Sequence, residues 1–204
     1  MALKRFNIGQ YGHGKYGQLE LNNVFFRREG AIEAQCALDP EKFATEGNEG
    51  VDNKIYAENG MILAVDKANG IVTLPGEDTT LPLALNYSTE HMYDERKKNL
   101  GSYYLPAGTF YPRMGYLKNG EIFTTNCLCY DDEEFTTQDV LVSALEKVGS
   151  DDPLFGVASN MGAIKLTNVP GEDPLKTRLI LKVVKYYTMP DGTPGIKFQV
   201  IASL

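Results

Sequence analysis

The fold is decided by the stretch Gly60-Met61-Ile62-Leu63-Ala64-Val65-Asp66-Lys67-Ala68-Asn69-Gly70-Ile71-Val72-Thr73-Leu74. Two apolar runs, residues 61–65 and 71–74, flank a polar loop that ends in Asn69-Gly70. Because Asn and Gly tolerate a positive φ, this pattern predicts a β-hairpin with a tight or bulged loop. Pro75-Gly76 ends the second strand, since proline donates no backbone hydrogen bond and glycine permits a chain reversal.

The residues that follow continue the pattern. Residues 81–86 alternate leucine with Pro, Ala and Asn, which predicts a strand with one apolar face. Residues 88–100 are a polar excursion that predicts at most a short helix. Two further apolar runs, 113–117 and 121–128, lie on either side of Lys118-Asn119-Gly120, and we expect a second hairpin there.

The C-terminal third adds one helix and a closing hairpin. A single apolar stripe follows the helical period of 3.6 residues, formed by Val140, Leu141, Ala144, Leu145 and Val148. Thr136 is a suitable N-cap, Asp139 favours the helix dipole, and Gly149 ends the helix. Residues 179–189 and 196–200 flank a turn rich in Pro and Gly and predict a third hairpin.

The N-terminal quarter predicts strands behind a glycine-rich segment. Residues 19–26 are β-prone, and residues 31–38 alternate so that one face is formed by Ile32, Ala34, Cys36 and Leu38. An acidic, glycine-containing loop follows. It divides the chain into residues 1–50, an arm with the first strands, and residues 51–204, a β-rich body. We therefore expect a mainly β fold: a hairpin-built β-barrel or β-tulip-like body with one short helix and an extended N-terminal arm.

Length and composition fit a globular protein that needs no disulfide or metal ion for stability. The chain has 204 residues, of which 43% are hydrophobic and 23% charged. A chain of this length buries about 70% of its unfolded surface, so neither a metal nor a disulfide is required. It has no tryptophan but twelve tyrosines, whose amphipathic rings suit sheet surfaces and protein contacts.

The charge is unevenly distributed. The net charge is −7, but residues 1–30 hold five Lys or Arg against two Glu, a net +3 that leaves −10 on the remainder. An acidic body repels phosphates, which argues against a nucleic-acid partner. The basic segment suits an acidic protein surface, or is simply part of a solubilising charge scatter. The chain also has neither a signal-peptide pattern nor an apolar stretch near the ~20 residues that span a bilayer, so we expect no membrane partner.

Motifs for catalysis or nucleotide binding are incomplete. Residues 9–15 mimic the start of a P-loop, but Tyr16 stands where Ser or Thr would bind magnesium. Only His13 and His91 are available as general bases, and both lie in segments that predict no rigid setting. We therefore expect no enzyme activity and no cofactor.

The cysteines and the acidic run predict no metal site. Three cysteines cannot all be paired within the chain, which favours synthesis in a reducing cytoplasm. Cys127 and Cys129 lie on one face of a strand, where a zinc site would need two further ligands and a mutual disulfide is geometrically awkward. They are small buried residues or thiols at a subunit contact. Asp131-Asp132-Glu133-Glu134 lacks the ligand spacing of a calcium loop and predicts a solvated acidic turn.

One resemblance bears on function. Residues 60–63, the hairpin that follows, residues 81–88, and residues 111–117 before Phe123-Thr124-Thr125-Asn126 resemble the head-decoration (cement) proteins of tailed bacteriophages, in particular the smaller lambda type. The resemblance covers about a third of the chain. It implies a structural virion protein, made in the host cytoplasm, that lies on the outer capsid, bridges major capsid protein subunits and forms a trimer.

The resemblance also gives the N-terminal segment a role. Residues 7–18 hold four glycines, a density that disfavours a regular element and predicts an extended arm or a disordered terminus. As an arm it would dock on the capsid or on a neighbouring protomer, and the candidate contacts are Lys4, Arg5, Phe6, Tyr11, Lys15, Tyr16, Arg27 and Arg28. The alternatives are a tail or head-completion protein and, from another class, a small hydrolase with no recognisable site.

Overall fold

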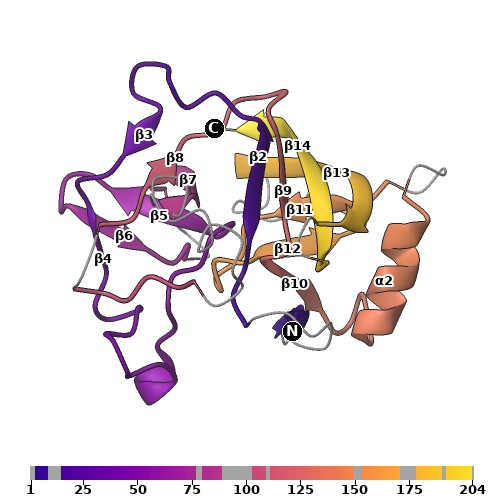
Figure 1. The fold of residues 1–204 in the computed structure, drawn as a ribbon, viewed down its shortest axis with the longest axis horizontal. Helices are drawn as coiled ribbons and strands as arrows, with labels where there is room; N and C mark the ends of the chain where they lie inside the picture. Colours follow the sequence, from indigo (N-terminus) through magenta and orange to yellow (C-terminus); the bar gives the residue numbers. More distant parts are fainter. Residues whose placement is uncertain are drawn as a thin grey trace.

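The computed structural model describes residues 3–8, 15–76, 80–88, 103–108, 111–148, 153–170, 178–189 and 192–203. These residues form two mixed β-sheets and one α-helix (Figure 1), which confirms the mainly β fold. Both sheets have open strand orders in the described part of the chain, so no closed barrel is found there. The predicted turns over residues 88–100 lie, apart from Ser88, outside the described residues.

The larger sheet has eight strands in the order β1-β10-β12-β11-β13-β14-β9-β2. All neighbours in it are antiparallel except β10 and β12. Its strands are β1 (Leu3–Arg5), β2 (Leu19–Asn23), β9 (Ile122–Thr125), β10 (Leu128–Asp131), β11 (Phe155–Val157), β12 (Ile164–Thr167), β13 (Leu179–Thr188) and β14 (Pro194–Ser203).

The smaller sheet has six strands in the order β3-β8-β7-β5-β6-β4, with only β4 and β6 parallel. Its strands are β3 (Ile32–Glu33), β4 (Ala37–Leu38), β5 (Ile62–Asp66), β6 (Ile71–Thr73), β7 (Leu83–Asn86) and β8 (Met114–Gly115). In Figure 1 it lies to the left of the larger sheet.

Two of the three predicted hairpins form. β5 pairs with β6 across the Asn69-Gly70 turn, where Gly70 has φ +68°. β13 pairs with β14 along their whole length, from Leu179 opposite Ser203 to Thr188 opposite Pro194. In both cases the local turn residues and the alternation agree with the final pairing.

The second predicted hairpin is wrong. β8 and β9 flank the Lys118-Asn119-Gly120 turn, but β8 pairs with β3 and β7 whereas β9 pairs with β2 and β14. After the turn the backbone is captured by β14: the Gly120 amide donates to Val200 O at 2.8 Å, and the Val200 amide donates to Glu121 O at 2.9 Å. The turn thus carries the chain from one sheet to the other.

The predictions of one apolar face for residues 31–38 and 81–86 are also partly wrong. Residues 31–38 form two short strands, β3 and β4, that pair with different partners. Cys36 and Leu38 are buried as predicted, but Ala34 is exposed and so is Ile32, with 37% of its surface accessible. In β7 every residue is buried on both faces, because this strand lies inside the smaller sheet.

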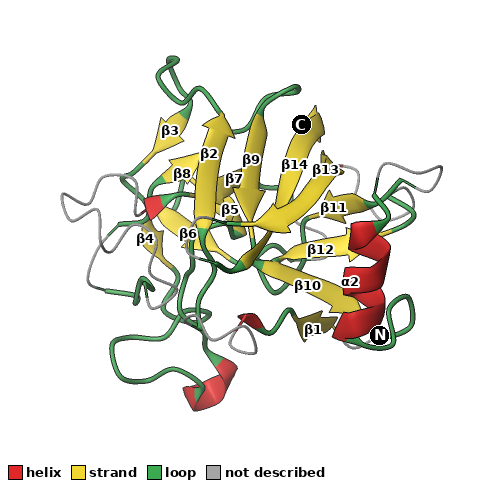
Figure 2. Cartoon of the chain, turned by 45° about the vertical axis from the view of Figure 1, so that its right-hand side comes forward, coloured by secondary structure: helices red, strands yellow, loops and turns green. Residues whose placement is uncertain are grey.

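The predicted helix is confirmed with a shifted start. α2 spans Gln138–Glu146, and its N-cap is Thr137, whose hydroxyl accepts a hydrogen bond from the Val140 amide. Leu141 and Leu145 are buried in the core, whereas Val140 is 46% exposed. Figure 2 shows α2 alongside the end of the larger sheet, next to β10 and β12. Gly149, the predicted end, lies outside the described residues.

Two large apolar clusters and a small third one, formed by Tyr16, Ala44 and Tyr56, fill the interior. The two large clusters lie on opposite faces of β5 and of β10. In β5, Ile62 and Ala64 belong to the larger cluster, and Leu63 and Val65 to the smaller one. β10 divides in the same way, since Leu128 and Tyr130 enter the larger cluster while Cys129 and the preceding Cys127 enter the smaller one. The thiols therefore do share a face, and that face is buried.

The N-terminal strands pair with the rest of the chain. β1 pairs with β10, β2 with β9, β3 with β8 and β4 with β6, so residues 3–38 contribute strands to both sheets. The division at residue 50 stays a prediction.

Gly60, just before β5, packs closely against the larger sheet. This residue has φ +87°, and a Cβ placed there would overlap the Thr125 side chain and lie 3.0 Å from the Cβ of Cys127. Gly70 has a similar φ of +68°, but nothing lies within 4 Å of the equivalent position.

We expect Gly60→Ala to lower the free energy of unfolding by about 2–4 kcal/mol, since it combines an unfavourable φ with overpacking. The matched variant Gly70→Ala has only the φ penalty and should lose about 1 kcal/mol. Denaturant unfolding of both variants measures the difference. Equal losses would show that the sheets do not pack closely at Gly60.

Candidate functional site

The N-terminal residues predicted as a free arm are docked on the body. Arg5 in β1 lies opposite Cys129 of β10, and the Phe6 amide donates a hydrogen bond to Leu128 O at 3.0 Å. The Phe6 side chain is only 3% exposed and belongs to the larger apolar cluster. Phe6 is therefore a core residue in this structure, rather than a residue available to a partner.

Arg5 fastens the docked segment through Glu58. Its Nη2 lies 2.7 Å from Glu58 Oε2, and the same oxygen accepts a hydrogen bond from the Gly17 amide at 2.6 Å. Its Nη1 is 3.4 Å from Cys127 Sγ. Burial alone lowers the pKa of Arg5, but the neighbouring Cys127 and Glu58 raise it, and the net direction is upward. The guanidinium is thus a fixed positive charge beside the carboxylate.

Lys15 and Tyr16 are also bound within the chain. Lys15 forms an ion pair with Glu49, and the Tyr16 hydroxyl donates to the same carboxylate at 3.0 Å. The Tyr16 ring packs beside Tyr56 and Tyr104 and is 8% exposed. Burial and the hydrogen bond to Glu49 raise the pKa of Tyr16.

The other four predicted contact residues differ in how exposed their side chains are. Lys4 is about half exposed and lies 3.5 Å from Asp132. Arg28 is largely buried, pairs with Glu121 at 2.6 Å and donates to the carbonyl oxygens of Phe25 and Tyr116. Arg27 is exposed and has no ion-pair partner among the described residues. Tyr11 lies outside the described residues.

Arg27 borders an apolar groove that was not predicted. The groove has a volume of about 350 Å³ and is lined by Leu21, Val24, Phe25, Phe26, Arg27, Ile32 and Tyr87. Phe25 is 61% exposed, and Phe26 packs inward against the ring of Tyr87, with ring centroids 4.6 Å apart. The groove therefore has a fixed aromatic floor and an exposed phenyl ring at its edge.

This composition is typical of a protein-binding surface. Aromatic residues and Arg are enriched in the cores of protein interfaces, where large side chains contribute most of the binding energy. The signal in the sequence is Val24-Phe25-Phe26-Arg27-Arg28, at the point where β2 has ended. The sequence predicts a β-prone segment over residues 19–26, and this prediction gives no sign that Phe25 is exposed.

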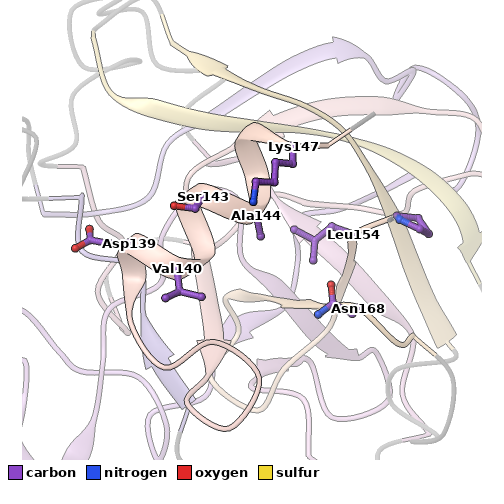
Figure 3. A pocket seen from close by; sticks show the side chains of 8 residues that line it. Asp139, Val140, Ser143, Ala144, Lys147, Leu154 and Asn168 are labelled. Carbon is purple, nitrogen blue, oxygen red and sulfur yellow. The ribbon is translucent and has the colours of Figure 1, made fainter. Parts of the chain in front are cut away.

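A second cavity lies beside α2 (Figure 3). It has a volume of about 760 Å³ and is lined by Asp139, Val140, Ser143, Ala144, Lys147, Pro153, Leu154 and Asn168. Asp139, Ser143 and Lys147 line it from successive turns of α2. Figure 3 shows Asp139 and Asn168 at opposite ends of the cavity. Within the described residues no hydrogen bond joins Ser143 to a basic side chain.

The remaining sequence predictions concern the histidines, the metal ligands and the acidic turn. The two histidines, His13 and His91, which are not expected to act as general bases, lie outside the described residues. The described residues contain no group of three or more His, Cys, Asp or Glu that could hold a metal ion. The solvated-turn prediction is wrong for Asp131, which is 3% exposed and lies 2.9 Å from Lys165 Nζ. Burial works against its charge, but the Lys165 hydrogen bond lowers the pKa of Asp131 overall.

No protein-family model matches the chain, and neither a curated protein nor a solved structure matches it significantly. Within the described ranges no helix is long and apolar enough to cross a membrane. Functional assignment therefore depends on the surfaces themselves.

The contribution of the Arg5–Glu58 ion pair to stability can be tested by comparing Arg5 with Lys4, its neighbour in β1. We expect Arg5→Ala to lower the free energy of unfolding by at least about 2 kcal/mol, because it leaves the buried Glu58 carboxylate without its counter-charge. Lys4→Ala removes only an exposed pair and should cost less than about 1 kcal/mol. Urea unfolding at neutral pH compares the two, and similar losses would contradict the fastening role of Arg5.

The thiols give a second test. Burial raises the pKa of Cys127 to about 12, despite the opposing Arg5 charge, and also raises the pKa values of Cys129 and Cys36. The thiolate is the reactive form, so we expect almost no reaction with a disulfide reagent at pH 8 in the native protein and three reacting thiols after denaturation. A native thiol that reacts within minutes would mean that one of them is accessible.

Proposed function

We propose that the protein is a structural virion component that decorates and stabilises the outer surface of a tailed-phage capsid by bridging major capsid protein subunits. The observation that carries this proposal is the exposed apolar groove with Arg27 at its edge. The resemblance of residues 60–126 to head-decoration proteins supplies the kind of partner. The activity proposed is binding, and no catalytic step is assigned to any residue.

The mechanism is mass action on an assembled lattice. A protein that binds the assembled capsid, but not its dissociated subunits, shifts the equilibrium toward assembly. Contacts made by one molecule to several subunits reinforce one another through effective concentration. Two sheets with a shared interior provide a body stiff enough to transmit this restraint.

The groove supplies the binding energy in this scheme. Phe25 is 61% exposed, and covering its ring contributes on the order of 1–2 kcal/mol. Within the described part of the chain Arg27 has no ion-pair partner. Its charge can therefore pair with an acidic group of a capsid subunit. The groove thus replaces the docked residues Arg5, Phe6 and Tyr16 as the leading contact surface.

We expect Phe25→Ser to weaken binding to undecorated capsids about tenfold, which corresponds to the loss of about 1.4 kcal/mol. Val184→Ser is the matched control, since Val184 is a similarly exposed apolar residue on β13, and it should bind normally. Co-sedimentation of the purified variants with capsids measures binding. Equal binding by both variants would exclude the groove as the capsid contact.

The proposal as a whole is tested by location. Quantitative mass spectrometry and cryo-EM of virions should find the protein in many copies over the head surface. A single ring at the portal or in the tail would favour a completion or tail protein instead. Absence from virions, or turnover of a small ester or glycoside by the purified protein, would refute the structural role.

A further inference from the structure

A projecting loop lies at the opposite end of the molecule from the groove. We call residues 45–55 the finger; its tip is the 3₁₀ turn Val51–Asn53. In Figures 1 and 2 this short helix lies at the bottom of the molecule, whereas the loop between β2 and β3, which carries the groove, lies at the top. The finger therefore cannot reach the groove of its own chain.

Tyrosines hold the base of the finger. The rings of Tyr56 and Tyr104 are stacked with centroids 4.2 Å apart, and Tyr104 donates to Glu46 at 2.6 Å. The hydroxyl of Tyr56 accepts a hydrogen bond from the Gly47 amide at 2.8 Å. On the other side, Glu49 accepts from Tyr16. A loop held at several points loses little conformational entropy when it binds.

The tip presents one apolar side chain beside one free charge. Val51 is 53% exposed. Asp52 and Asn53 adopt left-handed conformations with φ +53° and +60°, which Asp and Asn tolerate better than other side chains. Asp52 is exposed and has no ion-pair partner in the described parts of the chain.

The groove has the complementary arrangement. Its exposed apolar residues Phe25 and Ile32 lie beside Arg27, a free positive charge. A volume of about 350 Å³ readily admits a valine side chain. We propose that the finger of one copy docks in the groove of a second copy, with Val51 against Phe25 and Ile32 and with Asp52 paired to Arg27. This inference rests on the proposed function in one respect, that the groove is a protein-docking surface. In any one molecule the groove holds either a capsid subunit or a finger, so within a row of copies the capsid contact belongs to a copy whose groove is unfilled.

The contact joins two different surfaces, so the assembly is head-to-tail. Such heterologous contacts produce a closed ring or an open chain, depending on the rotation between copies. A single finger is a small contact. It is therefore weak in dilute solution and strengthened where copies are held side by side on a lattice.

Engineered thiols test the contact without interference, because all three native cysteines are buried. Val51→Cys mixed with Ile32→Cys, under mild oxidation, should give a disulfide-linked dimer at least tenfold faster than either variant alone. The cross-linking should be at least fivefold slower when the Ile32→Cys protein also carries Arg27→Glu. No acceleration in the mixture, or equally fast dimers of Val51→Cys alone, would overturn the proposal.

Charge reversal provides an independent test, with circular dichroism as the check that each variant is folded. Arg27→Asp and Asp52→Arg should each slow the cross-linking at least fivefold, and the double variant should restore it because the pair is re-formed with opposite polarity. Failure of the double variant to recover would overturn the proposal. The capsid assay separates the two levels: normal capsid binding without cross-linking ends this inference alone, whereas cross-linking by a protein that is absent from virions ends the proposed function.

Discussion

The carboxylate of Glu58 is the group on which the arrangement of the chain depends. One of its oxygens accepts hydrogen bonds from Arg5 at 2.7 Å and from the Gly17 amide at 2.6 Å, so it ties two N-terminal segments to the loop before β5. Cys127 Sγ lies 4.0 Å away, at the start of β10. A charge in this position is stable only with its partners present, because an uncompensated buried carboxylate is costly. The chain can then pack closely at Gly60 and Gly17, because a Cβ at Gly60 would overlap the Thr125 side chain and a Cβ at Gly17 would overlap that of Cys127.

Because of this junction, the surfaces that can bind other molecules lie in the outer loops. The strands near it, β5, β7 and β10, are buried on both faces, and their polar atoms are used internally: Asn86, for example, donates to Glu58 O at 2.8 Å. What such a body offers to other molecules is its loops. The groove after β2 and the finger before β5 are both held rigidly from within, by Phe26 against Tyr87 and by the tyrosine stack respectively.

Local signals in the sequence predict local structure well. The β5–β6 and β13–β14 hairpins and α2 follow from turn residues and periodicity, because each pairs or packs near itself in sequence. The partners of β8 and β9 are distant in sequence, and no local pattern specifies them. The same limit affects the site. Basic and glycine-rich residues indicated a free arm, because nothing near Arg5 or Lys15 in the sequence reveals Glu58 or Glu49 as their partners.

The place of β9 in the larger sheet has a consequence for biosynthesis. This strand lies between β2, from the beginning of the chain, and β14, from its end. On the ribosome, β2 can meet β9 long before β14 has been translated, and until then one edge of β9 stays open to other nascent chains. Polypeptides dominated by such distant pairings fold slowly and are vulnerable to aggregation while incomplete.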